Sequence, residues 1–227
     1  MTNFLLIRHG ETAWNRELRF QGQLDVPLNE MGFLQAQRLR IRLEKLLHEW
    51  HQTQQIPTRL ISSDLMRAKQ TAEPLAELLN LECLLETGLR EQCFGVFEGL
   101  RARDIQEKEP EAWQQWIQFN PHFAVRGAES THDFYERIMG TLNLLATKFI
   151  NENLVIVTHG GVLDMIWRNA RSLPLSGPRQ CDIPNAGLNQ VTWMNKNLEV
   201  KIWADTSHLE GLPAQPVYRQ RATQQPG

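Results

Sequence analysis

The stretch Asn3-Phe4-Leu5-Leu6-Ile7-Arg8-His9-Gly10 decides the fold of this chain. An uninterrupted apolar run of this length is typical of a strand buried on both faces of a parallel sheet. The run stops at an arginine, a histidine and a glycine. Ligands of parallel α/β sheets bind at the carboxyl ends of the strands, so Arg8 and His9 are candidates for a functional site.

Further strands and helices alternate along the chain. Apolar runs predict strands at 59–61, 83–85 and 154–157, and alternating residues predict two late strands at 188–194 and 199–204. Helical spacing predicts helices from about 30 to 50 with Asn29 as N-cap, from 65 to 79, from 131 to 151, and from 159 to 170. Ser62-Ser63-Asp64 is expected to cap the second helix, and Pro74 to kink it or mark its first turn. This order predicts a three-layer α/β/α sandwich with a mostly parallel central sheet.

The domain organisation follows from length and local composition. A chain of 227 residues without a linker predicts one domain, residues 1–213. Residues 99–130 are charged and carry Trp113 and Trp116, and we expect a helical insertion over the active site in which both tryptophans pack. The tail 214–227 is rich in proline and glutamine and is expected to be disordered.

Charge and cysteine usage exclude several classes of partner. A net charge of −2 gives no general attraction to nucleic acid or to an acidic membrane. The N-terminal apolar run is too short for a signal peptide or a membrane span. Cys83, Cys93 and Cys181 are odd in number and widely spaced, so we expect reduced cysteines, no metal site and a cytoplasmic protein.

The most reactive polar residues follow three predicted strands. These clusters are Arg8-His9-Gly10, Ser62-Ser63 with Arg67 soon after, and Thr158-His159-Gly160. Two arginine forks and two histidines suit a phosphate dianion, and neighbouring arginines should keep a histidine neutral and nucleophilic. On chemistry alone the two histidines are interchangeable. The candidates for a proton donor are Glu11, Asp64, Glu91 and Glu98, of which Glu11 and Asp64 are expected to be turn or capping groups that orient the arginines.

Five blocks of sequence resemble one known family. Arg8-His9-Gly10-Glu11-Thr12 is similar to the RHGET motif of the histidine phosphatase superfamily, in the branch that contains phosphoglycerate mutases, fructose-2,6-bisphosphatases, α-ribazole phosphatases and broad-specificity phosphatases. The similarity continues in family order at Trp14-Asn15, Gln21-Gly22, 25–28, 62–72, Leu89-Arg90-Glu91, 94–99, 127–130 and 158–161.

This resemblance implies a role for each matching residue. His9 would be the nucleophile that becomes phosphohistidine, and Glu91 the acid that protonates the leaving group and then activates water. The implied phosphate pocket consists of Arg8, Arg67, His159 and Gly160, with Asn15 and the Gln21-Gly22 backbone beside it. The family needs neither a metal ion nor another cofactor.

Departures from the mutase pattern favour hydrolysis. Gln92 follows Glu91, Phe94 replaces a tyrosine, and Ala102 stands where the mutases have a lysine. The motif at 92–99 resembles that of α-ribazole and broad-specificity phosphatases, although Phe97 replaces the usual tryptophan. We therefore expect a metal-independent phosphomonoesterase acting on a small phosphorylated metabolite. The alternatives are a phosphoglycerate mutase and a catalytically inactive protein that binds phosphorylated ligands. A homodimer through the late strands stays open.

Overall fold

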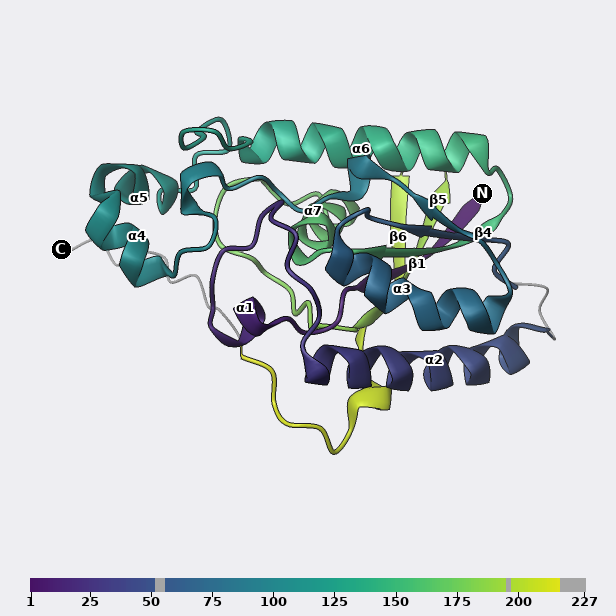
Figure 1. Ribbon diagram of the computed structural model, residues 1–227. Helices are drawn as coiled ribbons and strands as arrows, with labels where there is room; N and C mark the ends of the chain where they lie inside the picture. The colour runs from purple at the N-terminus through teal and green to yellow at the C-terminus, as the bar shows by residue number, and fades with distance from the viewer. Residues whose placement is uncertain (52–55, 195–196, 217–227) are drawn as a thin grey trace.

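The computed structural model describes residues 1–51, 56–194 and 197–216, and within them one six-stranded sheet forms the centre of the fold (Figure 1). The strands are β1 (Thr2–Arg8), β2 (Arg59–Ser62), β3 (Cys83–Leu85), β4 (Asn153–Thr158), β5 (Leu188–Met194) and β6 (Asn197–Asp205). Their order is β3-β2-β4-β1-β5-β6. The first four are mutually parallel, and β5 pairs antiparallel with both of its neighbours, β1 and β6. The predicted mostly parallel sheet is confirmed.

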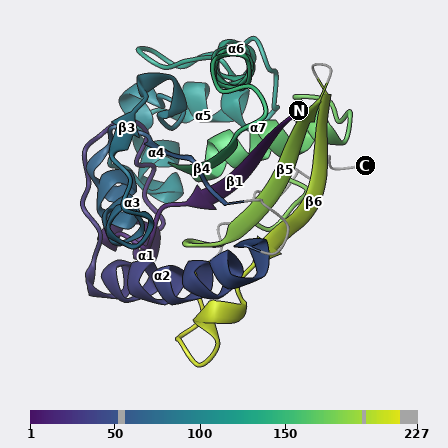
Figure 2. The ribbon, with the colours of Figure 1, turned by 90° about the vertical axis from the view of Figure 1, so that its right-hand side faces the viewer.

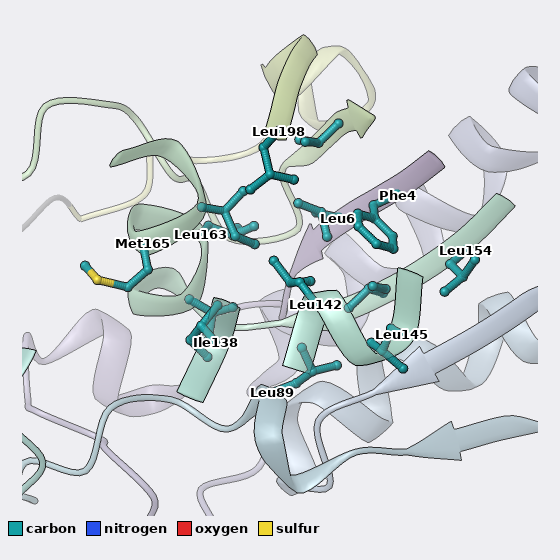
Figure 3. Close-up of a cluster of buried hydrophobic side chains, with 14 of the residues drawn as sticks. Phe4, Leu6, Leu89, Ile138, Leu142, Leu145, Leu154, Leu163, Met165 and Leu198 are labelled. Atoms are coloured by element: carbon teal, nitrogen blue, oxygen red, sulfur yellow. The ribbon is translucent and has the colours of Figure 1, made fainter. Parts of the chain in front are cut away.

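Helices cover both faces of the sheet (Figures 1 and 2). On one face, α2 (Glu30–His51) and α3 (Met66–Leu79) pack on Leu5 and Ile7 of β1. On the other, α6 (Thr131–Lys148) and α7 (Gly160–Ala170) pack on Phe4 and Leu6, in the cluster of Figure 3. Successive side chains of a strand point to opposite faces, so an apolar run with no polar alternation feeds both layers. The three-layer sandwich is confirmed.

Strand register brings the three polar clusters to one edge of the sheet. Arg8 lies opposite Thr158, and Ser62 lies opposite Val157. The residues that come next in each chain segment, His9, Ser63 and His159, therefore emerge together at the carboxyl ends of three adjacent parallel strands. The sequence predicted that Arg8 and His9 would lie at the carboxyl end of the first strand, and the structure places them there.

One of the two predicted helix N-caps is confirmed, and the other is wrong. Asn29 caps α2, because its Oδ1 accepts a hydrogen bond from Gly32 N at 2.8 Å. The prediction that 62–64 cap α3 is wrong: the N-cap residue is Leu65, and Asp25 Oδ1 accepts from Met66 N at 2.6 Å. Asp64 is unavailable as a cap because Arg90 binds both of its carboxylate oxygens.

Two helices depart from their predicted course. α3 continues past Pro74, which lies well beyond the first turn, so the alternative that Pro74 marks the first turn is wrong and the kink stays a prediction. α6 ends at Lys148 rather than at 151, and Asn151 has a left-handed φ of 62°, which a continuing right-handed helix excludes. Four short elements were not predicted: helix α1 (Ala13–Arg16) and the 3₁₀ turns η1 (Thr87–Leu89), η2 (Gly95–Phe97) and η3 (Ser207–Leu209).

Residues 99–130 fold as a helical segment with its own apolar cluster. Helices α4 (Ala102–Lys108) and α5 (Pro110–Trp116) lie beyond the carboxyl ends of the parallel strands (Figure 1). Trp113 stacks on Trp116 with ring centroids 5.3 Å apart, and Trp116 also packs edge-on against Phe20. The two tryptophans are packing residues, as predicted.

The C-terminal segment touches the loop that precedes β5. Gln215 Oε1 accepts from Asn185 N at 2.6 Å, and Gln215 Nε2 donates to Asn185 O at 3.0 Å. Most of the predicted disordered tail, residues 217–227, lies outside the described residues. No helix in the described part of the chain is long and apolar enough to cross a bilayer.

Candidate active site

Two buried histidines face each other at the carboxyl ends of β1 and β4. The ring centroids of His9 and His159 are 5.2 Å apart. Ser63, which follows β2, places its Oγ 2.8 Å from His159 Nε2. Each of the three strands that the sequence marked thus contributes one side chain to the same small volume.

Within the described residues, the hydrogen bonds of His9 leave one ring nitrogen, Nε2, without a partner. Its Nδ1 lies 2.7 Å from Gly10 O. A carbonyl oxygen only accepts, so Nδ1 carries the hydrogen and Nε2 keeps its lone pair. Burial, and then the charges of Arg67 and Arg8, hold the pKa of His9 well below its ordinary value. The imidazole is therefore neutral at neutral pH and can act as a nucleophile.

Neighbouring side chains fix the backbone around His9. Thr71 Oγ1 accepts from Gly10 N at 2.9 Å and donates to Arg67 O at 2.7 Å within α3, so one hydroxyl joins the loop after β1 to α3. Asn185 Nδ2 donates to His9 O at 3.0 Å. Thr71 and Asn185 are not among the site residues predicted from the sequence. Thr71 stands in one of the matching blocks, whereas no pattern marks Asn185.

Arg8 and Arg67 are held by backbone carbonyls. Arg8 Nη1 donates to Ile183 O at 2.6 Å, and Arg67 donates from Nη1 to Leu24 O and from Nη2 to Gly22 O. Burial, more than any neighbouring charge, lowers the pKa of each guanidinium to about 10. Both therefore remain cationic at neutral pH, in fixed orientations.

Three buried nitrogen atoms of the site have no hydrogen-bond partner in the described part of the chain. They are Arg8 Nε, Arg67 Nε and His159 Nδ1. Buried polar groups are normally paired, and leaving one unpaired costs about 1–3 kcal/mol. Burial and then the charges of Arg67, His9 and Arg8 also lower the pKa of His159. A tetrahedral oxyanion would satisfy these groups and would raise the pKa values of both histidines.

Glu91 lies at the N-terminus of α7, next to His159. Its Oε2 accepts from Gly161 N at 3.0 Å and its Oε1 from Gln92 N at 2.9 Å. Arg137 fixes this loop by donating to the carbonyl oxygens of Gly88, Arg90 and Glu91. Arg137 is not among the site residues predicted from the sequence, and it is 46 residues away from Glu91 in the chain.

The other candidate acids have structural partners. Glu11 accepts from Arg16 Nε at 2.9 Å, and Asp64 pairs with Arg90. Glu98 Oε1 accepts from the backbone N–H groups of Gln23 and Phe94. Glu11 and Asp64 do orient arginines, as expected, but these are Arg16 and Arg90 rather than the pair in the site.

Asn15 of α1 and the loop residues Gln21 and Gly22 lie beside the pocket. Thr12 donates from its N–H to Asn15 Oδ1 at 3.0 Å and from its hydroxyl to Gln21 Oε1 at 3.0 Å. Gly22 has a φ of +51°, and a Cβ atom on it would overlap the Glu98 carboxylate. A glycine suits this position because it adopts the left-handed conformation without strain and leaves room for the Glu98 side chain.

A comparison with models of known protein families shows to which family this chain belongs. The model for the histidine phosphatase superfamily (branch 1) matches residues 4–206. The chain belongs to this superfamily. The predicted family is thus confirmed over nearly the whole described chain.

Similar proteins place this histidine phosphatase among phosphatases and mutase-like proteins. It is 34% identical over 214 residues to a metal-independent phosphoserine phosphatase from Arabidopsis thaliana, covering 93% of this chain and 85% of the relative. It is 32% identical over 216 residues to the probable phosphoglycerate mutase GpmB of Cronobacter sakazakii, covering 92% and 96%. The solved mycobacterial glucosyl-3-phosphoglycerate phosphatase in complex with VO3 superposes with a TM-score of 0.76 at 28% identity, covering 90% and 99%.

These relatives establish the class of reaction. This histidine phosphatase is a phosphoric monoester hydrolase, as predicted. The names of its relatives refer to different substrates. Membership of the superfamily therefore establishes the type of reaction but not the substrate.

Proposed function

We propose that this histidine phosphatase is a metal-independent phosphomonoesterase that hydrolyses a small phosphorylated metabolite through a phosphohistidine at His9. The observation that carries the proposal is the neutral His9 with a free Nε2, next to unpaired nitrogen atoms of Arg8, Arg67 and His159. A nucleophile and donors for the transferred phosphoryl oxygens are thus already fixed in place.

The first step transfers the phosphoryl group to the enzyme. Arg8, Arg67, His159 and Asn15 hold the phosphate oxygens, helped by the backbone of Gln21, Gly22 and Gly160. His9 Nε2 attacks phosphorus as the bond to the ester oxygen breaks. Glu91 gives its proton to the departing alkoxide, which would otherwise be a poor leaving group.

The second step releases phosphate. Glu91, now a carboxylate, takes a proton from a water molecule, whose oxygen attacks phosphorus. The P–N bond breaks, and its electron pair returns to Nε2 of a neutral His9. Glu91 is protonated again and ready for the next cycle, so the two steps use the same two groups in opposite directions.

A mutase is the second candidate, because one relative is named as a probable phosphoglycerate mutase. The residues after Glu91 favour hydrolysis. The Phe94 ring packs edge-on against Phe20 with centroids 5.2 Å apart, and Gln92 Nε2 donates to Glu129 O. Both side chains thus contact other residues of the protein. They are therefore poorly placed to hold a substrate for the return of its phosphoryl group.

The test is turnover of a panel of phosphomonoesters, with and without EDTA. The panel contains phosphoserine, 3-phosphoglycerate, glucosyl-3-phosphoglycerate, α-ribazole phosphate and a hexose phosphate. We expect hydrolysis that resists EDTA, is abolished in His9→Ala and is unchanged in His48→Ala, which removes an exposed histidine of α2. An active His9→Ala protein would overturn the covalent mechanism. Isomerisation of 3-phosphoglycerate faster than its hydrolysis would make the enzyme a mutase.

A further inference from the structure

A third arginine lies at the edge of the phosphate pocket. After α7 the chain turns back toward the start of that helix, where it brings Arg179 close to Gly160. A Cβ atom on Gly160 would lie 3.3 Å from Arg8 Nε and 3.7 Å from Arg179 Nη2. The guanidinium groups of Arg8 and Arg179 therefore flank the same glycine, the first residue of α7.

The segment that carries Arg179 is anchored from within the protein. Buried Arg168, near the end of α7, donates from Nη1 to Pro174 O and Ser176 O, and from Nη2 to Gly177 O and Pro178 O. Its Nε donates to Asp164 Oδ2 at 3.1 Å. One buried side chain thus fixes the residues immediately before Arg179, so the place of Arg179 at the pocket is built into the fold.

The charge of Arg179 is only weakly countered. Its nearest carboxylate, Asp164, lies 3.9 Å from Arg179 Nε and is shared with Arg168, which is closer. Arg179 donates no hydrogen bond within the described residues, and its side chain is 40% exposed. Its charge also lowers the pKa of Arg8, the largest effect there after burial. A guanidinium fork that donates no hydrogen bond within the described residues remains free to bind an anion beside the phosphate.

We propose that Arg179 binds a carboxylate of the substrate, so that the enzyme prefers phosphate monoesters of short hydroxy or amino acids. This inference rests on the proposed function, because it needs the phosphate to lie at Arg8 and His9. A carboxylate matches one guanidinium fork in shape and charge. A second phosphate group would need more cations, and the phosphate pocket itself uses two arginines and two histidines.

Matched pairs of esters test the proposal. O-phosphoserine is compared with O-phosphoethanolamine, and 3-phosphoglycerate with glycerol 3-phosphate, since the second member of each pair lacks the carboxylate. In Arg179→Gln we expect kcat/KM for the two carboxylates to fall about 10- to 100-fold, mainly through KM, as for the loss of a charged hydrogen bond. The two esters without a carboxylate should change less than about twofold. Arg179→Lys should recover part of the loss.

Arg171→Gln is the matched control. Arg171 is an exposed arginine of the same connection, and its guanidinium lies over the Trp167 ring at 4.7 Å. This variant should leave all four substrates unchanged. An equal loss for every ester in Arg179→Gln, or no loss for any, overturns the proposal. A wild-type protein that hydrolyses a hexose phosphate or α-ribazole phosphate but neither carboxylate ester also overturns the proposal and leaves the proposed function standing. A wild-type protein that hydrolyses no ester of the wider panel contradicts the proposed function itself, which separates the two failures.

Discussion

At the residue scale, hydrogen-bond partners distinguish two histidines that are equivalent in the sequence. His9 pairs through Nδ1 with a backbone carbonyl, whereas His159 pairs through Nε2 with the Ser63 hydroxyl. The free nitrogen of His9 can attack, and the buried Nδ1 of His159 is left to donate to an oxyanion once the ring is protonated. These contacts support the assignment of His9 as nucleophile, which otherwise depended on the resemblance to the family.

The two proposed tasks of Glu91 can be separated with an activated ester. Nitrophenolate leaves without a proton, so Glu91→Gln should still form phosphohistidine from p-nitrophenyl phosphate. Water activation should be slowed about 10²- to 10⁴-fold, the usual contribution of a general base. We expect a burst of nitrophenolate close to one per active site, followed by a slow steady state, in rapid-mixing absorbance.

The control for this prediction is Glu111→Gln, which changes an exposed glutamate of α5 and should behave as wild type. A Glu91→Gln enzyme with no burst and an unchanged steady-state rate would contradict both roles of Glu91. Slow turnover with phosphoserine but no accumulated phosphoenzyme with the activated ester would leave Glu91 as the acid only.

At the element scale, the start of α7 positions the carboxylate of Glu91. A Cβ atom on Gly161 would lie 2.1 Å from Glu91 Oε1, so Gly161→Ala must displace that side chain. We expect turnover of phosphoserine to fall at least about tenfold, since a small misplacement of a catalytic group is costly. Steady-state kinetics and an unfolding curve should show the loss of activity exceeding any loss of folded protein.

Gly140→Ala provides the comparison for this substitution. Gly140 lies inside α6, and nothing lies within 4 Å of an added Cβ atom. Alanine there should raise the free energy of unfolding by about 0.5–1 kcal/mol without changing turnover. Equal activity of the two variants would show that the close approach of α7 to Glu91 does not matter for the reaction.

The sequence predicted elements better than the contacts between them. The range 83–85 matches β3, and 188–194 matches β5, because strand residues carry a pattern of their own. The cap of α3 could not be predicted: Asp25 reaches Met66 from 41 residues away, which no local pattern encodes. The roles of Asn185 and Arg137 could not be predicted for the same reason, since each donates a hydrogen bond to a backbone carbonyl of a distant loop.

At the scale of the whole molecule, the fold keeps two uncharged histidines buried between cations. Burial first, and then the charges of Arg67 and Arg8, hold the pKa values of His9 and His159 well below those in the unfolded chain. The low pKa keeps His9 neutral and nucleophilic. It also lowers the free energy of unfolding at acidic pH. The site is therefore coupled to the stability of the entire domain.

This coupling predicts how stability changes with pH. The folded pKa values are lowered, so below about pH 6.5, the ordinary histidine value, the unfolded chain binds protons that the folded chain does not. Stability is thus full above pH 6.5 and is lost as pH falls, at up to roughly 1.4 kcal/mol per pH unit for each histidine. Urea unfolding at pH 7.5, 6.5 and 5.5 measures it. The double variant His9→Asn, His159→Asn should lose much less stability between pH 6.5 and 5.5 than wild type. An equal loss in both proteins would show that other groups set the acid sensitivity.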